Sequence, residues 1–234
     1  MKRSRTRHPP LGPLELTGQS RAHVMERDGV TLQPEAWRDF QRMRQAAKRS
    51  GIDLCVASSF RDFATQVRIW NQKWHGERPL LDRRGRPMNA ARLKPTARVR
   101  AILLWSAPPG ASRHHWGSDL DVYDRAALRK DQRLQLVPAE YAETGPFAAL
   151  TTWLNANMYR FGFYRPYTTD RGGVQPEPWH LSHIASAREV SKRLRLPTLR
   201  RALGSSELGG RAALLANLPV VYSRFIRSVD RPPR

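Results

Sequence analysis

Apolar side chains with helical spacing and with strand-like spacing alternate between residues 34 and 159, and this alternation restricts the fold most. Residues 34–49 carry apolar side chains at helical spacing after a proline, which predicts an amphipathic helix. Residues 52–57 alternate briefly and predict a strand. Both patterns recur, with helical spacing in 62–74, 96–106 and 146–159 and strand-like spacing in 120–123. Because the patterns interleave, we predict an α+β fold with a small antiparallel sheet flanked by helices.

The length and composition fit one domain with an extension at each end. The 234 residues, 40% of them hydrophobic, can build one well-packed core. We predict a basic extension over residues 1–30, the main domain over residues 31–195, and a helical C-terminal extension over residues 196–234 that packs on or near it. The Gly-, Pro- and Arg-rich stretch 75–95 is typical either of a binding loop or lid or of a solvated connector.

The chain is strongly basic, with 41 Lys and Arg residues against 20 Asp and Glu residues and a net charge of +21. Arginine is spread over the whole chain, so the charge favours equally a solvated basic surface and association with an anionic surface or polymer. We expect no obligate nucleic-acid partner, because the sequence has neither zinc-finger spacing nor an aromatic RNA-binding motif.

The N-terminal residues and the single cysteine give information about the cellular compartment of the protein. The basic start is not followed by the continuous apolar stretch of a signal peptide, so we expect a cytoplasmic chain that would need another route to the periplasm or cell wall. No stretch approaches the roughly 18 apolar residues that a transmembrane helix requires. Cys55 lies in a predicted strand and, being the only cysteine, excludes an intramolecular disulfide.

Two imidazoles and two carboxylates lie within residues 112–121, in the sequence Ser-Arg-His-His-Trp-Gly-Ser-Asp-Leu-Asp. Catalytic zinc sites use three protein ligands, commonly imidazole nitrogen and carboxylate oxygen, and keep one position open for water. His114 and Asp121 can supply two of these ligands, because Gly117 between them permits a tight reversal of the chain.

The third ligand is predicted from the later sequence Glu177-Pro178-Trp179-His180. Glu177 and His180 would face opposite sides of a straight strand, so we expect the prolines on either side of Glu177 to bend the segment. Bent in this way, His180 completes the zinc site, and Glu177 lies where a carboxylate can take a proton from an attacking water. Such a site predicts hydrolysis of an amide bond.

These residues resemble the motifs of the zinc D-alanyl-D-alanine carboxypeptidases, a family grouped with the lysostaphin-type endopeptidases and the hedgehog signalling domain. The first motif is filled by Ser112, His114, Gly117 and Asp121, and the second by Glu177 and His180. Upstream, Ser59-Phe60-Arg61 with Gln66 resembles the family's Ser-aromatic-Arg element. The likeness extends from the helix near residue 34 to about residue 187.

The resemblance implies a zinc metallopeptidase that hydrolyses peptidoglycan stem peptides, as a D-alanyl-D-alanine or L,D-carboxypeptidase, with the zinc site on the small sheet. It implies that Arg61 acts with Glu177 in catalysis, facing the substrate carboxylate or the developing oxyanion. Ser59, Gln66 and Ser112 are expected to bind the substrate.

Three further polar residues lie within or near these motifs. His115 is next to a ligand and should point elsewhere, in a supporting or packing role. Asp119 is expected on the same strand face as Asp121, where it orients His114 or His180 or is solvated. His183 stands where these carboxypeptidases often carry an aromatic residue, and we do not expect it as a fourth ligand because catalytic zinc keeps an open position.

Two other functions stay open at this point. An endopeptidase that cuts the stem peptide or its crossbridge would use the same site. The second open function is a binding module that holds zinc without catalysing a reaction, as the hedgehog relatives suggest. The presence of Glu177 and Arg61 argues against it.

Overall fold

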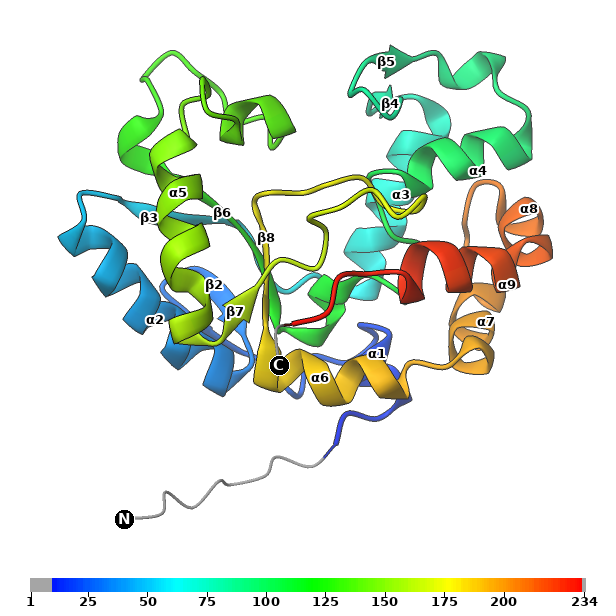
Figure 1. Ribbon diagram of the computed structural model, residues 1–234. Coiled ribbons are helices and arrows are strands. Elements are labelled where there is room, and N and C mark those ends of the chain that lie inside the picture. Colours follow the sequence, from blue (N-terminus) through cyan, green and yellow to red (C-terminus); the bar gives the residue numbers. More distant parts are fainter. Residues whose placement is uncertain (1–9, 233–234) are drawn as a thin grey trace.

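The computed structural model describes residues 10–232, and its centre is a four-stranded antiparallel sheet with the strand order β3-β6-β8-β7 (Figure 1). The strands are β3 (Leu54–Ser58), β6 (Asp119–Asp124), β8 (His180–His183) and β7 (Phe163–Tyr164). Helices lie on both sides of this sheet (Figure 1). The predicted α+β class is therefore confirmed.

The apolar face of the sheet packs against two helices. These are α2 (Pro34–Arg49) and α5 (Ala148–Asn157), which continues into a 3-10 turn, η5 (Met158–Phe161). Their buried side chains form one cluster with those of the strands, including Phe40, Met43, Leu54, Leu120, Val122, Leu150, Leu154 and Leu181. Because side chains alternate along a strand, the polar residues of β6 and β8 share the opposite face.

A second apolar cluster joins helices from distant parts of the chain on the other side of the sheet (Figure 1). The helices are α3 (Phe63–His75), α4 (Pro95–Leu103), α6 (Ile184–Arg193), α7 (Leu196–Gly204), α8 (Arg211–Ala216), α9 (Leu218–Val221) and a final π-helical turn, η6 (Tyr222–Arg227). Leu199 and Leu214 of the C-terminal segment are fully buried with Trp70 and Ile102 of α3 and α4. Within residues 10–232, no helix has the length and apolar content needed to cross a bilayer.

The described part of the N-terminal segment forms α1 (Pro13–Leu16) and a hairpin of β1 (Met25–Arg27) and β2 (Val30–Leu32). Asp28 and Gly29 have φ angles of 52° and 71°, as a tight hairpin turn requires. The hairpin is not among the predicted elements, although the Asp-Gly pair is a strong turn signal. It crosses residue 30, where the sequence predicts the end of the N-terminal extension.

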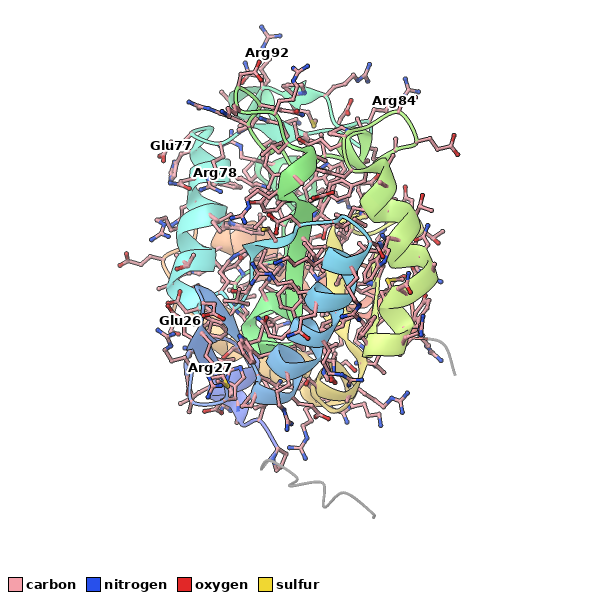
Figure 2. The ribbon with its side chains drawn as sticks, turned by 90° about the vertical axis from the view of Figure 1, so that its left-hand side faces the viewer. Glu26, Arg27, Glu77, Arg78, Arg84 and Arg92 are labelled. Atoms are coloured by element: carbon pink, nitrogen blue, oxygen red, sulfur yellow. The ribbon has the colours of Figure 1, made fainter. Side chains whose placement is uncertain are left out.

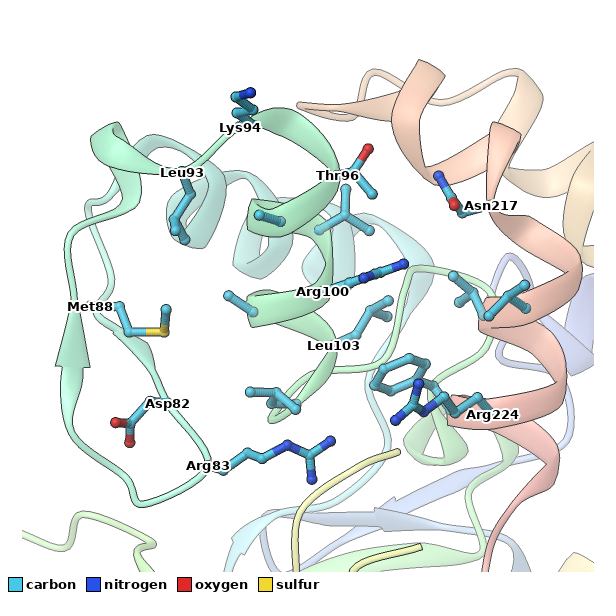
Figure 3. Close-up of a pocket in the computed structure, with 17 residues that line it drawn as sticks. Asp82, Arg83, Met88, Leu93, Lys94, Thr96, Arg100, Leu103, Asn217 and Arg224 are labelled. Atoms are coloured by element: carbon cyan, nitrogen blue, oxygen red, sulfur yellow. The ribbon is translucent and has the colours of Figure 1, made fainter. Parts of the chain in front are cut away.

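The stretch 75–95 forms a small hairpin of β4 (Leu80–Leu81) and β5 (Pro87–Met88), followed by a 3-10 turn, η1 (Ala90–Arg92). Leu80 and Ala90 are buried, so the stretch packs on the molecule and is not a solvated connector. Together with α4 and the C-terminal helices, the stretch lines a cavity of about 660 Å³ (Figure 3). None of the three predicted metal ligands lines this cavity.

Candidate metal centre

The polar face of the sheet brings two predicted ligands together. Asp121 of β6 pairs directly with His180 of β8 across the antiparallel strands, so their side chains are neighbours on one face. The adjacent pair, Leu120 and Leu181, points into the apolar cluster with α2 and α5. Asp121 and His180 are buried, with 5% and 4% of their surface exposed. The alternation of the strands therefore separates the candidate site from the core.

His114 reaches the same place from the loop before β6. It lies in a 3-10 turn, η2 (Arg113–Trp116), which ends at Gly117 with a φ of 63°. A Cβ atom at Gly117 would lie 2.2 Å from Cγ1 of Val24, so glycine is required at this turn. The reversal brings Nε2 of His114 to 3.4 Å from Oδ2 of Asp121. Ligand atoms of His114, Asp121 and His180 all lie within 4.8 Å of one another.

Hydrogen bonds behind the two imidazoles direct one nitrogen of each toward Asp121. Nδ1 of His114 lies 2.8 Å from the carbonyl oxygen of Ser59, which only accepts, so Nδ1 donates and Nε2 is the nitrogen that carries the lone pair in the neutral ring. Nε2 of His180 lies 3.0 Å from Oδ1 of Asp119. The other ring nitrogen, Nδ1, is therefore the one that faces Asp121. Oδ1 of Asp121 is buried and accepts no hydrogen bond from the residues that the structure describes. Two imidazole nitrogens around an unsatisfied carboxylate oxygen are a donor set that fits zinc.

The site attracts positive charge. Burial lowers the pKa of His180, but Asp119 and Glu177, together with Asp121, outweigh it and raise this pKa to about 10. Burial raises the pKa of Asp121, but His114 and His180 outweigh it and lower this pKa. A divalent cation competes with a proton for Nδ1 of His180, so metal binding here releases a proton.

Glu177 lies beside these donors because the chain turns before β8. The N–H of His180 donates to the carbonyl oxygen of Glu177 at 3.1 Å, which closes a turn over Pro178 and Trp179. The N–H of Glu177 donates to the carbonyl oxygen of Tyr167 at 2.9 Å. The segment is therefore bent, as the prolines predict. Oε2 of Glu177 lies 3.0 Å from Nδ1 of His180, so a water among the three donors is within its reach.

A buried ion pair supports His180 from behind. Nε of Arg113 lies 2.7 Å from Oδ1 of Asp119, and Nη2 of Arg113 donates to the hydroxyls of Ser182 at 2.6 Å and Tyr164 at 3.2 Å. Burial raises the pKa of Asp119, but the charge of Arg113 and the hydrogen bond from His180 outweigh it and lower this pKa. Of the alternatives for Asp119, the structure has it orient His180. The sequence analysis did not predict a role for Arg113. The one sequence argument that could have pointed to it is that a buried Asp119 needs a cation as its partner.

Arg61 approaches the site from the loop after β3. Its Nη1 donates to Oε1 of Gln66 at 2.9 Å and its Nη2 to Oγ of Ser58 at 2.9 Å. Burial lowers the pKa of Arg61, against the opposing effect of the charges of Asp121 and Glu177. The guanidinium is thus held in a fixed orientation within electrostatic reach of the two site carboxylates.

The three residues predicted to bind substrate lie in different settings. Gln66 is buried and holds Arg61. The hydroxyl of Ser59 accepts a hydrogen bond from the N–H of Thr31 at 3.1 Å, and its carbonyl orients His114. Ser112 begins the η2 turn, and its hydroxyl makes no hydrogen bond with another residue of the described part, which leaves it available to a substrate.

The other two histidines of these segments are held away from the three donors. Nδ1 of His115 lies 2.6 Å from the carbonyl oxygen of Arg61, and Nε2 accepts from the N–H of Gly110 at 3.0 Å. Burial lowers the pKa of His115 to about 3, so it is neutral and joins the Arg61 loop to the η2 turn. His183 caps α6, and its Nε2 lies 3.2 Å from Oδ2 of Asp39 on α2. Neither ring is placed as a metal ligand.

Comparison with known proteins identifies the family. The sequence profile named VanY, D-alanyl-D-alanine carboxypeptidase, matches residues 29–186, which include every predicted site residue. The chain belongs to the VanY family. An uncharacterized protein of Haemophilus influenzae is 34% identical over 118 residues, 50% of this chain and 90% of that protein. A D-alanyl-D-alanine carboxypeptidase of Enterococcus faecalis is 26% identical over 147 residues, 62% of this chain and 45% of that enzyme.

Two solved structures share the fold of this VanY-family chain. VanYB in complex with D-Alanine-D-Alanine has a TM-score of 0.51 and 22% identity, covering 85% of this chain and 94% of that chain. The LdcB LD-carboxypeptidase has a TM-score of 0.50 and 20% identity, covering 80% of this chain and 79% of that chain. The family predicted from the three motifs is therefore confirmed.

Proposed function

We propose that this VanY-family chain is a zinc-dependent carboxypeptidase that removes the C-terminal residue of peptidoglycan stem peptides. The main support is the convergence of His114, Asp121 and His180 next to Glu177 on the polar face of the sheet. The VanY profile supports a substrate that ends in a D-amino acid.

The residues of the site divide the reaction between them. His114, Asp121 and His180 would hold a zinc ion, which would supply Lewis acidity and so make water more acidic and a carbonyl group more electrophilic. Glu177 accepts a proton from the attacking water and passes it to the nitrogen of the leaving residue. Arg61 stabilises the negative charge that develops on the carbonyl oxygen, and its bonds to Gln66 and Ser58 keep it oriented for this.

Mass spectrometry of defined tetrapeptide and pentapeptide stems, with and without chelator, tests the proposal. We expect loss of one C-terminal residue, abolished by the chelator and restored by added zinc. Cleavage at an internal bond would instead assign the endopeptidase function. Failure of the zinc-loaded protein to cut either peptide would contradict hydrolysis altogether.

Replacing the base separates catalysis from metal binding. Glu177→Gln should retain zinc while its turnover falls roughly 10²–10⁴-fold, the usual contribution of a general base. Glu77→Gln is the matched control, because Glu77 is exposed on the outside of the molecule (Figure 2). Equal activity of the two variants would reject the role proposed for Glu177.

A further inference from the structure

Lys73 is a half-buried cation that the mechanism does not use. It lies in the last turn of α3, and its Nζ donates to Oγ of Ser106 at 2.6 Å. It forms no ion pair with a carboxylate whose side chain the structure describes. Burial lowers the pKa of Lys73 to about 8. A partly desolvated ammonium that makes no ion pair favours an anion that enters beside it.

Hydrogen bonds connect Lys73 to the same segment that supports Arg61. Gln66 and Lys73 are seven residues apart and therefore lie on one face of α3, two turns from each other. Gln66 binds the guanidinium of Arg61 and donates to the carbonyl oxygen of Ala107 at 2.7 Å. Lys73 donates to the next residue along this segment, Ser106. Lys73 and Gln66, which binds Arg61, thus lie on one face of α3, next to residues 106–107.

The segment that carries Glu177 is bound to the same stretch. The N–H of Gln175 donates to the carbonyl oxygen of Leu104 at 2.9 Å, two residues before Ser106. Among the charged groups that act on Lys73, Glu177 favours the ammonium most strongly, whereas Arg78 and Arg61 oppose it. Lys73 is therefore within electrostatic reach of the proposed catalytic base, in a region with three cations.

We propose that Lys73 binds the terminal carboxylate of the peptide substrate, while Arg61 faces the carbonyl group that is attacked. This inference rests on the proposed function and specifies it as release of a single C-terminal residue. In such a substrate the terminal carboxylate lies within about 4 Å of the attacked carbonyl carbon, since only the N and Cα of the leaving residue separate them. The anion therefore enters next to Glu177, where the ammonium group of Lys73 can neutralise it. An internal peptide bond has an amide at this place and leaves Lys73 unpaired.

The test compares a stem pentapeptide that has a free C-terminal carboxylate with the same peptide amidated at its C-terminus. Lys73→Met removes the charge at similar length, Lys73→Arg keeps it, and exposed Lys48→Met is the matched control. We expect Lys73→Met to raise KM for the free acid roughly 10–100-fold with little change in kcat, the effect of losing a charge-assisted hydrogen bond. Lys73→Arg should restore most of the affinity. Neither variant should alter the weak hydrolysis of the amide.

The pH dependence of KM is a second test, because it would not change if Lys73 served only in packing. Because burial lowers the pKa of Lys73 to about 8, its charge is lost as the pH rises through this pKa, and KM of the wild type for the free acid should rise with that loss. Lys73→Arg should remove this rise, because a guanidinium stays charged. An equal effect of Lys73→Met on the free acid and the amide, or none on either, would overturn the inference.

A binding measurement separates this inference from the proposed function. Calorimetry with the zinc-loaded Glu177→Gln variant reports affinity without turnover, with the free acid and the amide as probes. A preference for the free acid that disappears with Lys73→Met would support Lys73 even if the wild type hydrolysed neither peptide. Hydrolysis by the wild type without such a preference would leave the proposed function intact and refute the role of Lys73.

Discussion

Removing Arg113 should destabilise the protein through the carboxylate that it leaves behind. The side chains of Arg113 and Asp119 are 5% and 0% exposed, and their contact is 2.7 Å. Arg113→Met leaves Asp119 buried with Ser118 and His180 as its hydrogen-bond partners among the described residues. Breaking a buried ion pair on one side typically lowers the free energy of unfolding by about 3–5 kcal/mol, and we expect a loss in this range.

A second substitution shows whether the orphaned charge is the cause. In Arg113→Met/Asp119→Asn the charge is gone, while the amide oxygen can still accept from Nε2 of His180, so most of the lost stability should return. Urea unfolding followed by tryptophan fluorescence, in the presence of chelator, measures the folded protein without metal. Arg92→Met, on the outside of the molecule in Figure 2, should change stability by less than about 0.5 kcal/mol. A loss below about 1 kcal/mol for Arg113→Met, or a double variant no more stable than the single one, would refute the reasoning.

Two further substitutions test the metal centre and its loop. Asp119→Ala removes the acceptor that orients His180 and should weaken zinc binding roughly 10–100-fold in chelator competition; unchanged affinity would show that Asp119 does not position the ligand. Gly117→Ala adds a Cβ 2.2 Å from Val24 at a positive φ and should lower both thermal stability and zinc content. Gly51→Ala, also at positive φ but with open space around it, isolates the backbone effect, and equal losses in the two variants would rule out the clash.

The metal donors could be predicted because each lies in a short motif whose local chemistry is visible. Gly117 fixes the turn between His114 and Asp121, and the prolines beside Glu177 fix the bend before His180. Residues 34–49 were likewise predicted with the observed limits, because a proline begins the helix and a glycine follows it.

The supporting residues could not be predicted, because their partners are distant in sequence. Arg113 binds Ser182, 69 residues later, and Lys73 binds Ser106, 33 residues later. In a chain with 41 Lys and Arg residues, one more basic side chain carries no signal until the fold shows that it is buried. The role of Asp119 stayed open for the same reason, since its orientation toward His180 depends on the pairing of β6 with β8.

Metal stoichiometry tests the central claim most directly. The protein is stripped with chelator, reloaded with zinc, freed of excess metal, and analysed by elemental mass spectrometry beside Asp121→Ala and His180→Ala. The convergence of the three buried donors predicts about one zinc ion per wild-type chain and little in either variant. Wild-type protein that takes up no zinc, or variants that bind it equally well, would contradict the account.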